Sequence, residues 1–328
     1  MAWYIVKRLF YMIPTLFAIS VVAFVIINLP PGDYVDRLVI EAMNRGETMS
    51  ADAVAGLRET YGLNKSLVEQ YFAWIGNIVT RGDFGISFRW NLPVSTLLGE
   101  RLLLTIVLSF ATLIFIWCVA IPIGVLSAVR QYTVWDYLFT FICFVGLAVP
   151  NFLLALGLMY LSFRYLGQSV GGLISPQFAD QPWSMAKVMD LVGNLWIPMI
   201  VLGTAGIAEL VRTLRANLLD ELRKPYVVTA RTKGLPESWL LIKYPLRHAL
   251  NPFASSQNEI FVNLVSGGTI VSVVLGLQTI GPLLLEAFRS QDMYLAGSSV
   301  LLLGALAVLG TVFSDILLAW LDPRIRFD

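Results

Sequence analysis

The residues best suited to acid–base or metal chemistry are sparse in this chain and do not cluster. His248 is the only histidine, which excludes a site built on two histidines. A serine paired with His248 would be a nucleophile and its base, but no G-x-S-x-G turn supports such a pair. Cys118 and Cys143 both lie in apolar runs, which argues against a disulfide framework or a metal cluster. We expect no catalytic or metal site, and we expect His248 to contact a partner or lipid.

A few ionisable residues lie next to long apolar runs. Glu209, Arg212 and Arg215 follow one such run, and charges at membrane depth mark either a pathway or an internal pair. We favour the simpler interpretation that they mark the point where the chain leaves the membrane, with Glu209 and Arg212 paired at three-residue spacing. Asp315 lies between apolar residues, and we expect a hydrogen-bonded structural acid there rather than an ion site.

Composition defines the class of protein that must position these residues. The chain has 328 residues, of which 57% are hydrophobic and 14% are charged, whereas soluble domains carry about 25% charged residues. Such a chain cannot cover a water-facing surface, so a soluble globular protein is excluded. A net charge of +1 leaves no basic field for nucleic acid. The composition predicts an all-α, polytopic membrane bundle.

Six runs without Asp, Glu, Lys or Arg predict six transmembrane helices, each near or above the roughly 20 residues that cross the hydrocarbon. The runs are Leu9–Leu29, Leu102–Val129, Tyr137–Phe163, Leu191–Ala208, Ile260–Leu285 and Met293–Ser314. Four of them contain a proline that we expect to kink the helix, namely Pro14, Pro122, Pro150 and Pro198. The distribution of lysine and arginine puts both termini on the cytoplasmic side.

The long segment of residues 30–101 is then extracytoplasmic, and it contains helix signals. Ser50 is placed to cap a helix that runs to about Tyr61 and stops at Gly62. Ser66 and Glu69 have capping-box spacing ahead of an apolar stripe. The stripe consists of Leu67, Tyr71, Trp74, Ile75 and Ile78. It either packs onto the transmembrane bundle, which we favour, or lies along the membrane surface.

The cytoplasmic segment of residues 209–259 is basic and also helical in pattern. Asp220 and Lys224 stand four apart, as a helical ion pair would, and Pro225 interrupts the helix. Residues 226–233 then form about two helical turns before Gly234 ends them. A second short helix runs from Ser238 towards residue 246. This loop either docks onto a cytosolic partner or is a basic connection that contacts anionic lipid, and the residues alone favour neither.

The loop carries a recognisable motif. Residues 226–235 read YVVTARTKGL and resemble the cytoplasmic loop motif EAA-x3-G-x9-I-x-L-P of permeases in binding-protein-dependent ABC importers. Ala230 takes the last alanine position and Gly234 the glycine. Val228 and Thr229 replace the motif's Glu and Ala, and residues 244–247 (YPLR) replace its I-x-L-P ending. Further similarities to the dipeptide/oligopeptide/nickel group, and to its first permease subunit, are Tyr4–Leu9, Tyr61–Leu63, Gln70-Tyr71, Gly82–Gly85, Gly281-Pro282 and Leu321–Arg326.

This resemblance implies a fold, a site and a set of partners. The fold is that of a type I ABC importer permease, and the loop helix sits in a cleft of a cytosolic ATPase. The implied ATPase-coupling residues are Tyr226, Thr229, Ala230, Arg231, Lys233, Gly234 and Leu235. The implied partners are a second homologous permease, two ABC ATPases and an extracytoplasmic solute-binding protein. The chain has no G-x-x-x-x-G-K-[ST] motif, so we expect no cofactor here and ATP with Mg²⁺ on the ATPases.

The resulting hypothesis is a multi-pass subunit of the bacterial inner membrane, not itself an enzyme, that forms half of a peptide import path by alternating access. Its parts are residues 1–29 with the first span, residues 30–101 outside, and a five-helix core of residues 102–328 with the coupling loop 209–259. The same machinery importing oligosaccharides or metal chelates is the alternative. A secondary transporter or a membrane-embedded enzyme is more remote. The sequence does not assign the residues that line the path.

Overall fold

The computed structural model describes residues 2–29, 31–167, 171–179, 181–251, 262–263 and 268–321. Parts of the predictions fall outside them, namely Pro252, Glu259, much of the first half of Ile260–Leu285, and the residues after Leu321. Within the described residues the regular structure is helical, apart from one isolated antiparallel bridge between Ile86 and Pro93. The all-α prediction is confirmed.

The chain divides into two compact units. The first consists of Met1–Thr105 and Thr279–Leu306, and the second of Ile106–Gln278 and Ala307–Asp328. Two long helices, α5 (Val94–Val129) and α16 (Met293–Leu321), contribute residues to both units.

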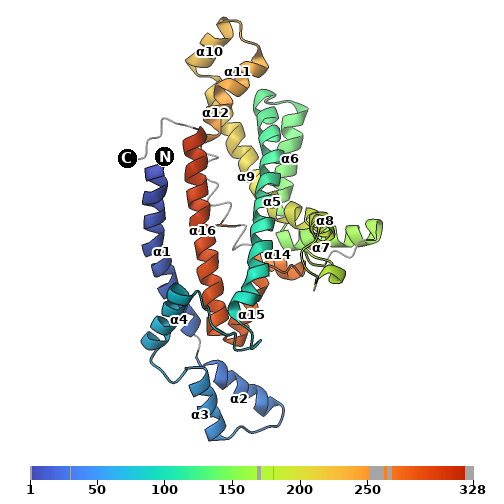
Figure 1. Ribbon diagram of the computed structural model, residues 1–328. Helices are drawn as coiled ribbons and strands as arrows, with labels where there is room; N and C mark the ends of the chain where they lie inside the picture. Colours follow the sequence, from blue (N-terminus) through green and yellow to red (C-terminus); the bar gives the residue numbers. More distant parts are fainter. Residues whose placement is uncertain are drawn as a thin grey trace. The chain divides into compact units, whose positions relative to one another are not determined.

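Polar N-cap residues determine where several helices of the first unit begin. Its other helices are α1 (Ala2–Asn28), α2 (Tyr34–Asn44), α3 (Ala51–Thr60), α4 (Leu67–Arg81) and α15 (Ile280–Ser290) (Figure 1). Ser50 caps α3, and Ser66 forms the predicted capping box with Glu69 at the start of α4. Helix α2 was not predicted; it begins with a second capping box, between Asp33 and Asp36.

Helix α4 packs onto α1 through its apolar stripe. Tyr71 and Trp74 are buried against Phe24, and the hydroxyl groups of Tyr71 and Ser20 lie 2.8 Å apart. The favoured interpretation, packing onto a membrane helix, is therefore confirmed. Leu67 is an exception, since it is exposed.

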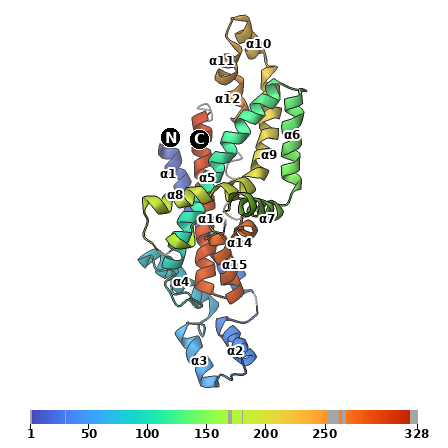
Figure 2. The ribbon, with the colours of Figure 1, turned by 90° about the vertical axis from the view of Figure 1, so that its right-hand side faces the viewer.

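The second unit holds most of the remaining helices. They are α6 (Val134–Ala148), α7 (Asn151–Leu161), α8 (Met185–Asn194), α9 (Trp196–Leu222), α10 (Pro225–Thr232), α11 (Glu237–Lys243), α12 (Pro245–Ala249) and α14 (Thr269–Val274), with a π-helical turn (Ser162–Leu166) and a 3-10 turn (Pro176–Phe178). Figures 1 and 2 show α6 alongside α9, and α10, α11 and α12 grouped beyond the C-terminal end of α9. The loop helices are therefore presented together at one end of the unit.

Four helices are long and apolar enough to cross a membrane, and a bent pair adds a fifth candidate. The four are Phe10–Asn28, Val94–Val129, Trp196–Leu222 and Met293–Leu318, and the pair is Val134–Ala148 with Asn151–Leu166. These agree with the first, second and sixth predicted runs. The pair bends by 103° because Val149, before Pro150, is extended (ψ 120°), as the residue before a proline prefers. At Pro150 the structure therefore has a break between two helices, α6 and α7, instead of the expected kink within one helix.

The structure differs from the prediction in the fourth and fifth runs. Leu191 belongs to α8, a separate helix capped by Ser184, so the fourth membrane helix starts at Trp196 and extends well past Ala208. Pro198 lies in its first turn, where a missing N–H costs nothing, and the kink expected there stays a prediction. The described half of Ile260–Leu285 is not one helix, because Gly276 (φ +63°) separates α14 from α15.

Candidate functional site

Helix α10 forms and ends as the predicted loop motif requires. Pro225 occupies its first turn, where proline is favoured. Gly234 has φ +76°, a left-handed conformation that glycine adopts readily, and its N–H donates to the carbonyl of Arg231 at 3.0 Å. A Cβ on Gly234 would meet nothing within 4 Å, so the backbone angle rather than packing requires glycine. The two-turn helix ending at Gly234 is confirmed.

The loop has a small apolar core of its own. Val227 and Ala230 of α10 are buried against Leu240 of α11. The predicted second helix is present but divides into α11 and α12, because Pro245 starts a new helix. The loop is therefore a compact group of short helices with its own apolar contacts.

An ion pair closes this group on its exposed side. Arg231 donates from Nε and Nη2 to the two carboxylate oxygens of Glu237, the second bond measuring 3.1 Å. This bonding lowers the pKa of Glu237 and raises that of Arg231. Because both side chains are exposed, the pair adds little stability, and it mainly fixes α10 relative to the start of α11.

A second set of polar contacts joins α10 to the end of α9. The Tyr226 hydroxyl donates to Glu221, and Lys224 Nζ lies 2.6 Å from the same carboxylate. Burial and this hydrogen bond raise the pKa of Tyr226, so the hydroxyl stays protonated as the donor. The expected pair between Asp220 and Lys224 is wrong, because α9 ends at Leu222 and Lys224 turns back to Glu221 instead.

A cavity of about 410 Å³ lies against α10. Its lining consists of Tyr226, Thr229, Ala230, Lys233, Leu235, Tyr244 and His248. Most of the residues assigned by resemblance therefore face one space, while Arg231 and Gly234 are not part of its lining. His248 joins them with its ring edge-to-face on Tyr226 at 5.9 Å between centroids. The described lining contains no serine or cysteine.

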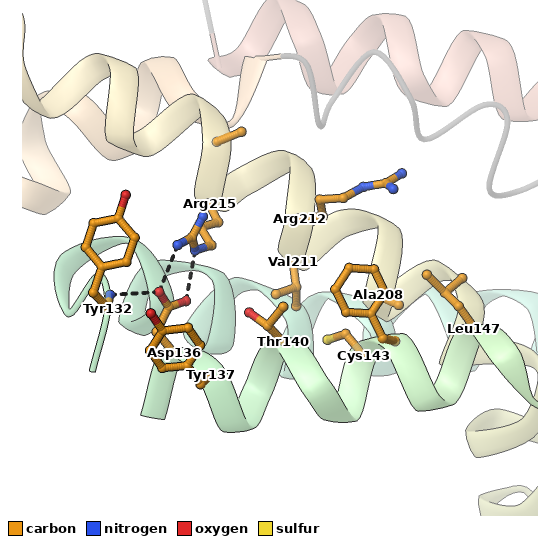
Figure 3. A pocket seen from close by; sticks show the side chains of 12 residues that line it. Tyr132, Asp136, Tyr137, Thr140, Cys143, Leu147, Ala208, Val211, Arg212 and Arg215 are labelled. Atoms are coloured by element: carbon orange, nitrogen blue, oxygen red, sulfur yellow. Dashed lines mark hydrogen bonds and ion pairs between the residues drawn. The ribbon is translucent and has the colours of Figure 1, made fainter. Parts of the chain in front are cut away.

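A buried ion pair links α9 to α6, and sequence reasoning missed it. Arg215 donates from Nε and Nη2 to the carboxylate of Asp136 at 2.9 and 2.8 Å, and the backbone N–H of Tyr132 donates to the same group at 3.0 Å (Figure 3). The Asp136 side chain is 3% exposed. The structure thus pairs Arg215, and no ion pair joins Glu209 to Arg212 among the described residues. An acid in the first turn of an apolar run was the available signal.

In the first unit, the Gly82–Gly85 motif makes a tight turn after α4. Gly82 is the left-handed C-cap of α4, and the side chain of Asp83 accepts a bond from the N–H of Gly85 at 2.9 Å. Gly85 has φ +86°, and a Cβ there would lie 3.0 Å from the ring of Tyr294. This motif therefore fixes the turn against the start of α16.

A buried acid, Asp292, lies next to this turn, just before α16. Asp292 is fully buried before α16 and accepts from the Ser87 hydroxyl and, at 3.1 Å, from the N–H of Leu295. Burial raises the pKa of Asp292. Sequence reasoning missed this residue, although an Asp just before an apolar helix is a helix-cap signal. Asp315 is half-buried on α16, and its structural role stays a prediction.

Together the long apolar helices and the compact loop define a polytopic helical membrane protein with a folded group of short helices after α9. Residues 120–327 match the family described as the binding-protein-dependent transport system inner membrane component, and residues 1–111 match its N-terminal family. The chain belongs to this family. It is a multi-pass inner-membrane permease component of a transporter, and it is not the ATPase.

Similar proteins cover the whole chain. The oligopeptide transport system permease protein AppB of Bacillus subtilis (strain 168) is 34% identical over 100% of both chains. The dipeptide transport system permease protein DppB of Alkalihalophilus pseudofirmus is 31% identical over 99% of both chains. The oligopeptide transport system permease protein OppB of Escherichia coli (strain K12) is 28% identical over 99% of both chains.

Proposed function

We propose that this chain forms half of the translocation path of an ATP-driven importer of short peptides. The relatives named above as oligopeptide and dipeptide permeases match over nearly their whole length. The single observation that carries the mechanism is the compact loop of α10, α11 and α12, which is more structure than a connection between spans needs. A second related permease, two cytosolic ATPases that bind ATP and Mg²⁺, and an extracytoplasmic binding protein complete the transporter.

The proposed topology has six spans and both termini in the cytoplasm. Four long helices and one broken pair supply five spans, and the remaining one is the predicted run Ile260–Leu285, whose first half lies mostly outside the described residues. Lysine and arginine concentrate in the loop after α9, which favours a cytoplasmic position for that loop. Residues 30–101 are then outside, where they contribute to docking the binding protein.

Motion of the ATPase reaches the spans through α10. In this mechanism α10 lies in an ATPase cleft, and only Arg223 and Lys224 separate it from α9. The bond from Tyr226 to Glu221 fixes α10 against the end of α9, and α9 is continuous from Trp196 to Leu222. A displacement of α10 is therefore transmitted along α9. The pair of Asp136 and Arg215 passes it to α6.

The cavity beside α10 offers the test. Thr229→Trp places an indole in the cavity from an exposed position, and Lys233→Glu reverses an exposed charge of its lining; neither residue belongs to the apolar core of the loop. We expect both variants to lose co-purification of the ATPase subunit with the tagged chain. Ile242→Trp is the matched control and is expected to keep the ATPase, because Ile242 is exposed on α11, outside both α10 and the cavity lining. Normal ATPase recovery with both Thr229→Trp and Lys233→Glu would contradict docking at this site.

Peptide specificity is tested separately, because the binding protein selects the solute. We expect the cognate binding protein to bind dipeptides or oligopeptides in a ligand screen by calorimetry. Binding of an oligosaccharide or a metal chelate instead would contradict the peptide assignment. That result would leave the permease role intact.

A further inference from the structure

A groove of about 300 Å³ runs between α6 and α9 within the second unit (Figure 3). Its lining residues recur at helical spacing, from Asp136 to Leu147 on α6 and from Ala208 to Ala216 on α9. At 1.5 Å per residue the α6 side is roughly 16 Å long. This length matches one leaflet, which is half of the ~30 Å hydrocarbon core of a bilayer.

The groove is apolar at one end and polar at the other. Cys143, Phe144 and Leu147 line the end that lies deeper along α6. Tyr132 and Tyr137 line the opposite end, together with the ion pair between α6 and α9. Tyrosine favours the level of lipid headgroups. The polarity therefore changes along the groove as it changes across a single leaflet.

The polar end has an excess positive charge. Asp136 and Arg215 neutralise each other. Arg212 lines the groove one helical turn deeper, is exposed, and forms no ion pair among the residues that the structure describes. Figure 3 shows its guanidinium extended away from Asp136. One cationic group is thus available beside an apolar channel of leaflet length.

We infer that this groove binds an anionic phospholipid of the cytoplasmic leaflet, with an acyl chain between α6 and α9 and the headgroup phosphate at Arg212. Basic pockets between membrane helices on the cytoplasmic side suit anionic headgroups. The inference rests on the proposed topology, which places the Tyr132 end of the groove at the cytoplasmic surface. A bound lipid packs against the same two helices that Asp136 and Arg215 join, so it stiffens the link between α9 and α6.

Native mass spectrometry of the intact transporter, titrated with dioleoylphosphatidylglycerol or dioleoylphosphatidylcholine, tests the inference. We expect the anionic lipid to bind the wild-type complex about fivefold more tightly, the effect of about 1 kcal/mol from one arginine near the surface. Arg212→Gln removes this preference, whereas Arg223→Gln, which alters an exposed arginine outside the groove, keeps it.

Filling the groove tests the position of the acyl chain. Thr140→Trp and Ala216→Trp both place an indole in the groove. Each is expected to weaken phosphatidylglycerol binding by about fivefold or more. Ala216 is exposed, so its replacement does not depend on repacking. Leu138→Trp, on the same helix but outside the lining, is the matched control and leaves binding unchanged.

Three results would overturn the inference. The first is equal affinity of the wild-type complex for the two lipids, and the second is unchanged phosphatidylglycerol binding in both tryptophan variants. The third is displacement of the lipid by a transported peptide, which would assign the groove to the solute path. Failure of the importer proposal is distinguishable, because it appears as loss of the ATPase from the purified complex.

Discussion

Asp136 is a buried acid whose charge is balanced by a single arginine, Arg215. Its side chain is nearly inaccessible, and Arg215 supplies two of its hydrogen bonds. Removing one member of a buried pair leaves an uncompensated charge, which costs about 3 kcal/mol or more. We therefore expect Arg215→Gln to lower the free energy of unfolding by about 3 kcal/mol, measured by denaturant titration in detergent.

The double variant separates the charge from the geometry. Asp136→Asn with Arg215→Gln leaves no buried charge, so it is expected to recover most of the loss. Arg223→Gln, an exposed arginine at the end of α9, serves as the control and stays within about 0.5 kcal/mol of the wild type. An Arg215→Gln variant as stable as this control would show that the pair does not hold α6 to α9.

Gly85 is constrained by packing as well as by its backbone angle. Gly85 and Gly46 both have positive φ, +86° and +79°, but a Cβ on Gly46 meets nothing within 4 Å while one on Gly85 meets the ring of Tyr294 at 3.0 Å. Gly46→Ala is expected to cost about 1 kcal/mol from the backbone alone. Gly85→Ala is expected to cost measurably more in the same thermal unfolding assay. Equal losses of stability in Gly46→Ala and Gly85→Ala would show that the contact with Tyr294 does not constrain Gly85.

Among the helices, α4 has a first turn whose stability we expect to depend on pH. Hydrogen bonds from Ser66 lower the pKa of Glu69 below its ordinary value of 4.5. A carboxyl whose folded pKa is depressed contributes stability above its unfolded pKa and loses it as the pH falls through the folded pKa. Amide hydrogen exchange in the first turn of α4, corrected for the intrinsic pH effect, is therefore expected to accelerate below pH 4.5.

Glu69→Gln provides the control for this effect. The amide side chain still accepts a bond from the backbone but does not titrate, so the acceleration below pH 4.5 disappears. Persistence of the acceleration in Glu69→Gln would assign it to another group.

Element boundaries were predictable where one local residue sets them. Ser50 and Ser66 accept bonds from backbone N–H groups at the starts of α3 and α4, and Gly234 ends the α10 turn at a positive φ. The start of α9 was not predictable in this way, since Leu191–Ala208 contains no charged residue and α8 gives way to α9 at Leu195, which forms no side-chain cap. Pro150 predicted a kink, and the extended backbone of Val149 before it makes this a 103° bend.

The site was predictable only in part. The motif around Gly234 is local, so its residues were found together, and most of them line one cavity. Arg215 and Asp136 are 79 residues apart, and no spacing rule pairs residues across two helices. His248 reaches the cavity by way of two further short helices, and its contact with Tyr226 depends on how they pack.

At the scale of the whole molecule, the proposed function makes the chain a conduit that a separate ATPase moves. The compact loop, its bond to the end of α9 and the buried pair to α6 form a continuous set of contacts within the second unit. Family membership supplies the transport role. In the proposed function the energy comes from ATP hydrolysed by the ATPase subunits.

Uptake of a labelled peptide into proteoliposomes tests this claim most directly. Vesicles are prepared with the complete transporter or with this chain and its permease partner alone, each with the loaded binding protein outside and with or without ATP inside. The account predicts uptake above the solute gradient only for the complete transporter with ATP. Uptake at the same rate by the permeases alone, without nucleotide, would contradict it.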